Sequence, residues 1–445
     1  MLIANRGEIA LRVIRACREM GIATVAVYSD ADRGALHVLH ADEAYRLGPA
    51  PTVESYLRGD LILDVARRTG ADAVHPGYGF LSENADFAEA CAKAGVTFIG
   101  PPASAMRMLG SKTRARRAAD AAGMPRVPGS VTGLADVAEA LRVAAGIGYP
   151  VMLKAAAGGG GKGMRAVTRA EDLGAAFTAA SSEAERSFGS GEVYLEKLIE
   201  RPRHIEFQVL GDRHGNVIHL GERECSLQRR HQKVLEESPS VVVDAETRQR
   251  VGKQVVDALK AIGYSSAGTM EFLREESGNL YFIEMNARIQ VEHPVTEMVT
   301  GVDLVKSQIR VAAGERLEKV LPPIEFRGHA IECRINAEDP DTFTPSAGKV
   351  TAFRVPGGPG IRVDTACYAD AVIPPYYDSL IAKLISHGHD RAEAIVRMQR
   401  ALDGFVVEGV KTTIPLHKRI LADPNFLAGK FDTHFLERMT AVETK

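Results

Sequence analysis

The sequence predicts a protein of mixed α/β and α+β class, built from about three domains. Its 445 residues correspond to about three domains at roughly 150 residues each. Through residue 99, short apolar runs alternate with amphipathic helical stretches, which is typical of a parallel, doubly wound sheet. From residue 203 onward strand patterns dominate. The segment after Pro322-Pro323 is rich in glycine, proline and short alternating strands.

The N-terminal section repeats a strand–helix order. In its first helix Ile9, Val13 and Cys17 recur at helical spacing, and Gly21 ends that helix. The strands predicted here are 2–5, 24–28, 71–75 and 96–99, and the helices are 8–20, 60–69 and 85–94. Because glycine and proline interrupt regular structure, Gly100-Pro101-Pro102 marks the expected end of the section.

The middle section begins with a helix and then changes to strands. A charged helical stretch ends near Ser187, and Pro322-Pro323 marks the next expected boundary. The other predicted helices are 112–122 and 302–313, and the strands are 151–154, 164–167, 193–198, 205–210, 217–220, 268–273 and 280–286.

Composition excludes several classes of protein. Lys plus Arg is 55, Asp plus Glu is 57 and the net charge is -2, which argues against a general nucleic-acid binder. No apolar run reaches about 18 residues, so no membrane span is expected. Five cysteines without a CxxC pair favour a reducing compartment, and the early charges do not fit a signal peptide. The cytoplasm is the predicted location, or an organelle matrix if a transit peptide is removed.

A run of glycines at 158–161 lies between Lys154 and Lys162. Glycine lets backbone N–H groups approach phosphate oxygens without a Cβ in the way. The run is not a Walker A loop, because Gly163 follows Lys162 and the flanks read as strands. We interpret it as a hairpin that folds over phosphates. A flexible surface hairpin is the alternative.

Two consecutive predicted strands carry polar side chains that could meet. Glu284 and Asn286 share a face of one strand by period two, and Glu271 lies on the preceding strand. The short polar link between these strands predicts a hairpin, which would bring the three side chains together. Carboxylate and amide oxygens suit Mg²⁺ or Mn²⁺ carrying phosphates. Solvent-facing glutamates are the alternative.

Two further segments carry polar chemistry. Arg288, Gln290 and Glu292 share one face if the backbone is extended, and this set suits a small oxyanion that must lose a proton. His293, beside a proline, reads as structural. The basic segment 228–233 predicts an anion site beside the phosphate machinery, or else a solvated face.

Six longer motifs together resemble the biotin carboxylase family, the ATP-grasp component of acetyl-, propionyl- and methylcrotonyl-CoA carboxylases. They extend in the family's order from near Ile3 to near Leu436, so the resemblance is specific and nearly complete. The motifs are NRGEIA at 5–10, HPGYGFLSEN at 75–84, GGGGKGM at 158–164, RRHQK at 229–233, EMNARIQVEHPVTE at 284–297 and GHAIECRINAED at 328–339.

The resemblance implies an architecture and a reaction. It implies a Rossmann-like N-terminal domain at 1–110, an ATP-grasp domain at 111–320 with a mobile lid at about 130–204, and a β-rich C-terminal domain at 327–436. The implied enzyme is an ATP-dependent ligase that uses bicarbonate to carboxylate biotin on a carrier protein through carboxyphosphate, as the first half-reaction of an acyl-CoA carboxylase. Its implied cofactors are ATP and two Mg²⁺ or Mn²⁺ ions, with carrier-bound biotin as substrate.

The resemblance also implies roles for individual residues. The residues that match catalytic ones are Lys233, Arg288, Glu292 and Arg334, with Glu292 as the base. Those that match the bicarbonate site are Lys233, Arg288, Gln290, Val291 and Glu292. Tyr78 and Arg334 match the biotin site, and Glu271, Glu284 and Asn286 match the metal ligands. The residues that match ATP contacts are Lys112, Lys154, Gly160, Gly161, Met164, Glu196, Lys197, Leu198, His204, Gln228, His231 and Leu273.

The implied partners are a biotin carboxyl carrier protein or domain, a second copy of the chain (a homodimer) and a carboxyltransferase subunit. Neither nucleic acid nor a membrane is an expected partner. No Ala-Met-Lys-Met segment occurs in the sequence, so biotin is expected to arrive on another polypeptide or on a region beyond this one. Two alternatives remain: a ligase like carbamoyl-phosphate synthetase, and a catalytically silent scaffold for the components of a carboxylase.

Overall fold

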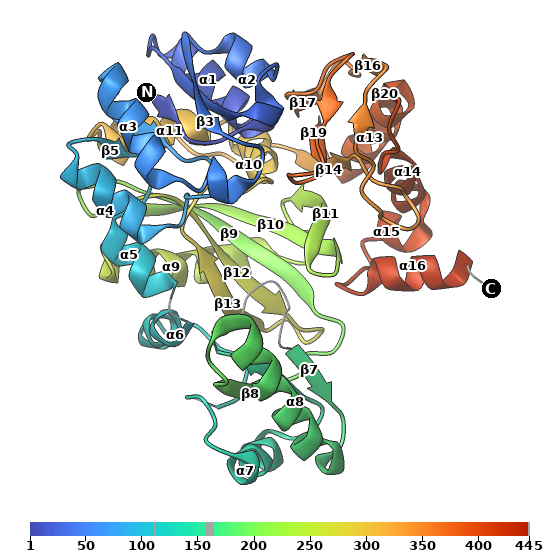
Figure 1. Ribbon diagram of the computed structural model, residues 1–445. Helices are drawn as coiled ribbons and strands as arrows, with labels where there is room; N and C mark the ends of the chain where they lie inside the picture. The colour runs from blue at the N-terminus through green and yellow to red at the C-terminus, as the bar shows by residue number, and fades with distance from the viewer. Residues whose placement is uncertain (111, 131, 157–163, 444–445) are drawn as a thin grey trace.

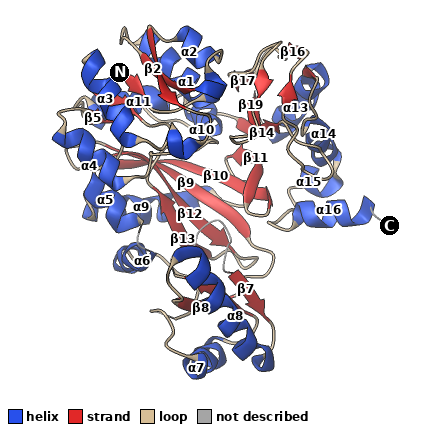
Figure 2. Cartoon of the chain, in the orientation of Figure 1, coloured by secondary structure: helices blue, strands red, loops and turns tan. Residues whose placement is uncertain are grey.

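The computed structural model describes residues 1–110, 112–130, 132–156 and 164–443. Figure 1 shows an N-terminal part and a C-terminal part above a broad central sheet, with a smaller unit around α7 and α8 projecting at the opposite end. Strands concentrate in the middle of the molecule and most helices lie around them (Figure 2). The mixed α/β fold predicted from the sequence is confirmed.

The N-terminal part is a parallel sheet in the order β3-β2-β1-β4-β5. The predicted strand–helix alternation is therefore confirmed. β3 was not predicted, because much of this edge strand is exposed and its apolar signal is weak. The strands are β1 (Leu2–Ile3), β2 (Val25–Ser29), β3 (Glu43–Gly48), β4 (Ala73–His75) and β5 (Thr97–Phe98). The helices are α1 (Gly7–Glu19), α2 (Leu36–His40), α3 (Gly59–Thr69), α4 (Ala85–Lys93) and α5 (Ala103–Leu109), with 3-10 turns η1 (Asp30–Asp32) and η2 (Thr52–Glu54).

The chain changes direction in this sheet beside β1, whose neighbours β2 and β4 lie on opposite sides. Ligand sites in open α/β sheets form at such a switch point, beyond the carboxyl ends of the strands. Asn5 follows β1, and its Nδ2 donates to the carbonyl oxygens of Pro76 and Tyr78 at 2.6 and 2.7 Å. The loop after β4 is thereby held next to the N-terminus of α1.

A continuous antiparallel sheet forms the centre, in the order β13-β12-β9-β10-β11-β14-β19-β17. Its middle strands are mostly buried, and the aromatic rings of Phe207, Phe272 and Phe282 pack edge to face beneath it. The strands are β9 (Arg203–Gly211), β10 (Val217–Arg229), β11 (Gln232–Ser238), β12 (Ser266–Arg274), β13 (Leu280–Asn286), β14 (His329–Asn336), β17 (Ile361–Thr365) and β19 (Leu380–Gly388). The nearby helices are α9 (Ala245–Ala261), α10 (His293–Thr300), α11 (Leu304–Ala312) and α12 (Leu317–Val320).

The projecting unit has its own sheet and its own apolar core. β6 (Val151–Ala155) lies between β7 (Met164–Val167) and β8 (Val193–Lys197), and α7 (Val137–Ile147) and α8 (Ala170–Phe188) pack against these strands. α6 (Lys112–Ala121) leads into the unit. Side chains from Leu134 to Leu195 form a core cluster of this unit alone. α7 was not predicted as a helix from the sequence.

The C-terminal part contains helices as well as the strands expected there. α13 (Arg391–Gly404) packs on β19 and β14, and Ile395, Met398 and Leu402 enter the core. These helices were not assigned from the sequence. The remaining helices are α14 (Ile414–Ala422), α15 (Pro424–Leu427) and α16 (Phe435–Glu443), and the small strands are β15 (Gly348–Lys349), β16 (Ala352–Arg354), β18 (Val372–Ile373) and β20 (Val406–Glu408).

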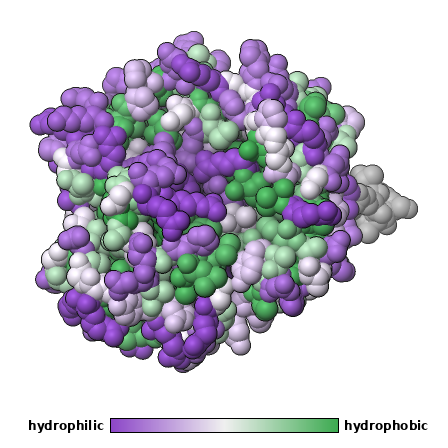
Figure 3. Space-filling model, turned by 90° about the horizontal axis from the view of Figure 1, so that it is seen from above, coloured by the Kyte–Doolittle hydropathy of each residue, from purple (hydrophilic) through white to green (hydrophobic). Residues whose placement is uncertain are grey.

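Two expectations from composition are tested by the fold. All five cysteines are free and buried, as expected for small apolar core residues. Among the described residues, none of the helices combines the length and the apolar character needed to cross a membrane. On the face seen in Figure 3, hydrophobic residues form separate areas among hydrophilic ones.

Candidate active site

Lys233, at the start of β11, is the centre of a buried cluster of carboxylates. Its Nζ lies 2.5 Å from Glu206 Oε2, 2.9 Å from Glu271 Oε1 and 2.7 Å from Glu292 Oε1. Burial opposes the charge of Lys233, but these carboxylates outweigh it and raise the lysine pKa well above its ordinary value. The ammonium therefore stays charged and gathers side chains from β9, β12 and the turn before α10.

Glu292 bridges this cluster to the C-terminal part of the chain. It is fully buried and is the N-cap residue of α10. Its Oε2 accepts a hydrogen bond from Arg334 Nη2 at 3.0 Å, while Oε1 faces Lys233. Burial alone would raise the pKa of Glu292, but the charges of Lys233 and Arg334 hold it well below its ordinary value. The carboxylate is therefore ionised and able to accept a proton.

Arg334, on β14, contacts two carboxylates at once. Besides Glu292, its Nε donates to Glu236 Oε1 at 2.6 Å, from the neighbouring strand β11. Burial raises the pKa of Glu236 to about 7, and Glu292 adds to this against the charge of Arg334. The guanidinium lies at the seam where β11 and β14 pair.

The three predicted metal ligands come together on β12 and β13. Glu271 and Glu284 face each other directly across the strand pair, and Asn286 Nδ2 donates to Glu271 Oε1 at 2.9 Å. Burial raises the pKa of Glu271, but Lys233 and His204 outweigh this and lower it. Carboxylate oxygens and an amide oxygen on one sheet face are the hard oxygen ligands that Mg²⁺ prefers, so the residues fit this ion.

The segment 287–292 is not a strand, as an alternating face would require, but a bend followed by a turn. Its side chains still converge. Arg288 Nη1 donates to Gln290 Oε1 at 2.9 Å, and Arg288 Nη2 donates to Asn286 Oδ1 at 3.0 Å. Gln290 Nε2 lies 3.3 Å from Glu271 Oε1. The Nδ1 atom of buried His293 lies 2.7 Å from the Gln290 carbonyl oxygen, and the turn brings Glu292 inward.

The predicted nucleotide residues lie partly in the projecting unit. Lys154 Nζ on β6 donates to Glu196 Oε2 on β8 at 2.6 Å. Lys197 donates to the carbonyl oxygens of Gly148 and Tyr149 at 3.0 and 2.9 Å, and the Leu198 N–H donates to the Pro150 carbonyl oxygen. These bonds tie β6 and β8 together and hold the segment that precedes β6 against the end of β8.

Other predicted nucleotide residues lie on the central sheet or outside the described residues. His204 Nε2 lies 3.1 Å from Glu271 Oε2, and Leu273 pairs with His204 across β9 and β12. Gln228 is buried near the end of β10, and His231 is exposed in the turn before β11. Met164 begins β7, Gly160 and Gly161 lie outside the described residues, and Lys112 begins α6, although its side chain is not described.

Tyr78, predicted for biotin, lies in the loop after β4. Its hydroxyl donates to the buried carboxylate of Glu8, in the first turn of α1. Glu8 in turn lies 3.3 Å from the ammonium of Lys383 on β19. Tyr78 therefore belongs to a network that reaches the C-terminal part, where Arg334 also lies.

Three buried residues of the cluster were not predicted from the sequence, namely Glu206, Glu236 and Arg223. Fully buried Arg223 binds Glu206 Oε1 at 2.5 Å and also reaches Gln208, Thr269 and Thr296 at 2.6 to 3.0 Å. A signal was present, because His204, Glu206 and Gln208 share one face of β9, opposite Ile205, Phe207 and Val209. In a strand that is buried on both faces, such a polar face indicates ion pairs or a site.

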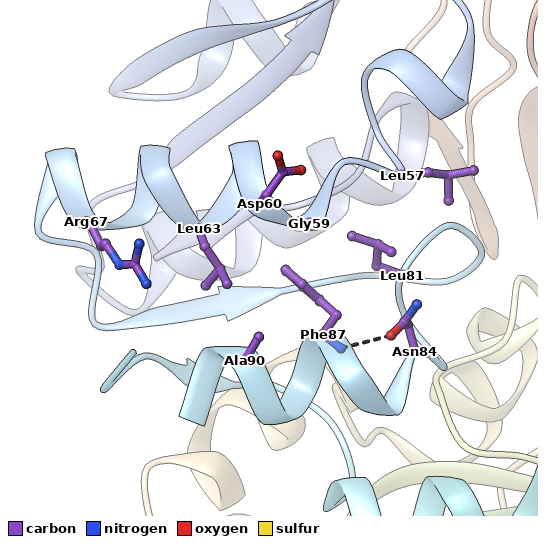
Figure 4. A pocket seen from close by; sticks show the side chains of 9 residues that line it. All are labelled: Leu57, Gly59, Asp60, Leu63, Arg67, Leu81, Asn84, Phe87 and Ala90. Carbon is purple, nitrogen blue, oxygen red and sulfur yellow. Dashed lines mark hydrogen bonds between the residues drawn. The ribbon is translucent and has the colours of Figure 1, made fainter. Parts of the chain in front are cut away.

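A cavity of about 440 Å³ lies elsewhere, between α3 and α4 (Figure 4). Leu63, Leu81 and Phe87 give it a mainly apolar lining, and Asn84 Oδ1 accepts a hydrogen bond from the Phe87 N–H at 2.8 Å. It contains none of the predicted site residues. The cluster of carboxylates around Lys233 is therefore the better candidate for the active site.

Family models match nearly the whole chain. "Biotin carboxylase, N-terminal domain" matches residues 1–106. "Carbamoyl-phosphate synthase L chain, ATP binding domain" matches 111–320, and "Biotin carboxylase C-terminal domain" matches 332–438.

Relatives of known identity are similar over nearly their full length. A biotin carboxylase of Nostoc sp. is 56% identical over 440 residues, 99% of this chain and 98% of the relative. Biotin carboxylase 1 of Bacillus subtilis is 56% identical over 439 residues, 98% of this chain and 98% of the relative.

Solved structures have the same fold. The biotin carboxylase domain dimer of the Hydrogenobacter thermophilus 2-oxoglutarate carboxylase, in complex with MgADP, ADP and bicarbonate, has a TM-score of 0.94 at 55% identity and covers 99% of this chain and 97% of that one. A Campylobacter jejuni biotin carboxylase in a nucleotide complex also has a TM-score of 0.94, at 50% identity, covering 98% of each chain.

Proposed function

The chain belongs to the biotin carboxylase family, and from this premise we propose that the cluster around Lys233 and Glu292 is its carboxylating centre. As a member of the family it is an ATP-dependent ligase of the ATP-grasp type, which uses ATP, Mg²⁺ and bicarbonate to carboxylate biotin. The observation that carries the proposal is the contact of one buried, ionised carboxylate, Glu292, with both Lys233 and Arg334.

In this proposal Glu292 is the base that activates bicarbonate. Lys233, Arg288, Gln290 and the Val291 segment hold the anion beside it. When bicarbonate draws the cations toward itself, Glu292 loses part of the field that keeps its pKa low, so its proton affinity rises at the moment of transfer. The same cations neutralise the charge of the carboxyphosphate that forms there.

Glu271, Glu284 and Asn286 would hold two Mg²⁺ or Mn²⁺ ions, which would supply positive charge to the ATP phosphates when bound. Lys154 and Lys112 would contact the same phosphates. Glu196, Lys197 and Leu198 lie at the end of β8 and just before β9, where the projecting unit joins the central sheet, a position that suits the adenine. His204, Gln228, His231 and Leu273 would complete the nucleotide site, with Met164 at the start of β7.

Arg334 and Tyr78 would bind the ureido group of biotin. Arg334 reaches Glu292 from the C-terminal part of the chain, and Tyr78 approaches from the N-terminal part. In this arrangement the guanidinium is close to the bicarbonate site and can stabilise the enolate form of biotin during transfer. Phosphoryl and carboxyl transfer would then occur in adjoining positions.

We further propose the bounds of three domains and a role for the projecting unit. Residues 1–110, 111–320 and 327–436 form the three domains, and the unit at about 130–204 acts as a lid. The separate apolar core of residues 134–195 supports this, because a unit with its own core can move as one body. Closure would exclude water from carboxyphosphate, which hydrolyses readily.

The proposed partners are a biotin carboxyl carrier, a carboxyltransferase and a second copy of this chain. The solved relative with MgADP and bicarbonate is a dimer, which supports the last of these. We propose a cytoplasmic location. Similar relatives belong to pyruvate and 2-oxoglutarate carboxylases as well as to biotin carboxylases, so the acceptor of the carboxyl group depends on the partner transferase. An acyl-CoA is our proposed acceptor.

ATP cleavage by the purified protein tests this proposal. We expect phosphate release in the presence of bicarbonate and Mg²⁺ to increase when free biotin is added, and ammonia to have no such effect. Stimulation by ammonia but not by biotin would indicate a ligase like carbamoyl-phosphate synthetase. Cleavage that responds to neither bicarbonate nor biotin would indicate a silent scaffold.

A further inference from the structure

Lys383 is a fully buried lysine that the proposed reaction does not use. It lies on β19, and its Nζ donates to the Val291 carbonyl oxygen at 2.9 Å. The same ammonium lies 3.3 Å from Glu8 Oε1 and 4.0 Å from Asp364 Oδ2. One cation thus contacts the N-terminal helix α1, the segment that precedes α10, and the C-terminal strand β17.

The two contacts of Lys383 each lead to a residue that is proposed to act on a substrate. Glu8 accepts the hydrogen bond of the Tyr78 hydroxyl, so Lys383 fixes the acceptor for the proposed biotin residue. Val291 directly precedes Glu292, so the bond to its carbonyl oxygen fixes the backbone that carries the proposed base. Lys383 is also the cross-strand partner of Arg334, because the two residues face each other where β19 pairs with β14.

Glu8 lies closer to the Lys383 ammonium than Asp364 does, at 3.3 Å against 4.0 Å. Asp364 already forms two hydrogen bonds with Arg362, at 2.9 and 2.7 Å. Glu332 is fully buried, and both of its carboxylate oxygens lack a hydrogen-bond partner in the described part of the chain. Burial and the neighbouring carboxylates raise the pKa of Glu332 well above its ordinary value, against the opposing charge of Lys383.

A lysine in this place is not explained by stability alone. A buried ion pair costs desolvation and is often no more stable than apolar residues of the same volume. The ammonium instead fixes the positions of its partners. It has three N–H donors and a positive charge, so it can hold a carboxylate and a carbonyl oxygen at a defined distance from each other. Misplacement of reacting groups by even about 1 Å lowers the rate of reaction strongly.

We propose that Lys383 is a positioning residue, which aligns Tyr78 through Glu8 and Glu292 through the Val291 carbonyl oxygen. The proposal rests on the proposed roles of Tyr78 and Glu292. It implies that one side chain from the C-terminal part of the chain sets the positions of both the proposed biotin-binding residue and the proposed base for bicarbonate.

The test compares Lys383→Met, which keeps much of the volume but loses the charge and the donors, with Arg391→Met. Arg391 is a matched control, because it lies in the same part of the chain and pairs with a buried carboxylate, Glu237, at 2.7 Å. KM values for free biotin, bicarbonate and ATP are measured in the full-length proteins, together with the thermal unfolding midpoint.

We expect Lys383→Met to raise the KM for biotin about tenfold or more, the usual effect of losing a charged hydrogen bond, and to leave the KM for ATP unchanged. Arg391→Met should lower the unfolding midpoint without changing the KM for biotin. A folded Lys383→Met protein with unchanged KM values for biotin and bicarbonate would overturn the proposal, even if it were less stable.

Glu8→Gln decides the matter if Lys383→Met does not fold. The amide keeps an oxygen acceptor for the Tyr78 hydroxyl and keeps the volume, but it removes the charge that Lys383 meets. A raised KM for biotin supports the proposal and an unchanged one overturns it. Failure of the proposed function is recognised separately, because the unmodified protein would then show no biotin-stimulated ATP cleavage.

Discussion

At the scale of single residues, the ionisation of Glu292 decides whether the cluster is catalytic. Glu292→Gln removes the proposed proton acceptor but keeps the size of the side chain. We expect turnover to fall by about 10²–10⁴-fold, the usual effect of losing a positioned proton-transfer group. ATP binding should persist, because the nucleotide residues lie elsewhere. Bicarbonate-dependent phosphate release and nucleotide titration measure the two effects.

Glu237→Gln is the control for this substitution. Glu237 is an equally buried carboxylate on β11, but its partners are His329 and Arg391 rather than Lys233. Turnover should be nearly unchanged in this variant. Near-normal turnover in Glu292→Gln would remove Glu292 from the mechanism.

Substitution of Arg334 should affect biotin carboxylation and ATP cleavage to different extents. Arg334→Ala leaves Lys233 and Glu292 in contact but removes the guanidinium proposed to bind biotin. We expect biotin carboxylation to fall more than bicarbonate-dependent ATP cleavage without biotin. The two rates are measured on the same preparation with free biotin as acceptor. Equal losses in both would contradict the assignment of Arg334 to the biotin step.

Residue predictions from the sequence succeeded where short-range periodicity applies. Period two placed Glu284 and Asn286 on one face, and the strand pair brings Glu271 to them. Glu206 and Glu236 were missed, because their partners lie 27 and 98 residues away along the chain. No local pattern indicates which distant cation a buried carboxylate will meet.

At the scale of elements, part of a family motif serves helix formation instead of chemistry. Asn84 ends the motif at 75–84 and caps α4, with its Oδ1 accepting from the Phe87 N–H. Asn84→Ala should lower the free energy of unfolding by about 1 kcal/mol, the usual value of an N-cap. Urea unfolding measures this, and KM values for ATP and biotin should not change.

Asn84→Asp provides the matched control, because aspartate caps helices as well as asparagine does. Its stability should remain near that of the unmodified protein. A change in the KM for biotin without a change in stability would show that Asn84 has a role in substrate binding.

The predicted bounds of helices and strands were wrong where the pattern of apolar residues was weak. β10 extends to Arg229, far beyond the predicted end at residue 220, because its later residues are polar but pair inside the sheet. α10 begins at His293, directly after residues 288–292, whose polar side chains would share a face only if the backbone were extended, and Pro294 fits the first turn of this helix. In β10, tertiary contacts overrode the local pattern.

At the scale of the whole molecule, buried neutral histidines predict how stability depends on pH. Burial lowers the pKa of His37 and His417 to about 4 and that of His75 to about 3. Each takes up a proton near pH 6.5 in the unfolded chain but resists it in the fold. Their contribution is thus complete above about pH 6.5 and is lost as the pH falls toward 4.

We expect His37→Leu to reduce this acid sensitivity. The His37 side chain is fully buried, and its shift corresponds to about 3 kcal/mol between about pH 6.5 and pH 4. Free energies of unfolding in urea, measured across this range, should fall less steeply for the variant. Parallel curves for the two proteins would show that His37 does not contribute.

At this scale, the presence of strands along the chain was predicted better than their pairing over long distances. The parallel N-terminal sheet and the later strand-rich sections follow from local patterns. That β11 and β14 pair, so that one sheet continues past Pro322-Pro323, could not be predicted, because strand pairing depends on contacts between distant residues. Lys233 and Arg334 reach the same carboxylate only because of this pairing.

The β11–β14 seam also has a practical consequence. Residues 321–328, which connect its two sides, are largely exposed and contain no helix or strand. A protease cut there would break the chain but leave four ladder pairs, from Leu235 with Cys333 to Ser238 with Ala330, holding the pieces together. The two fragments, made separately, each carry half of the Glu292–Arg334 contact. Restored activity on mixing would show that pairing of β11 with β14 is enough to bring the two halves of the site together.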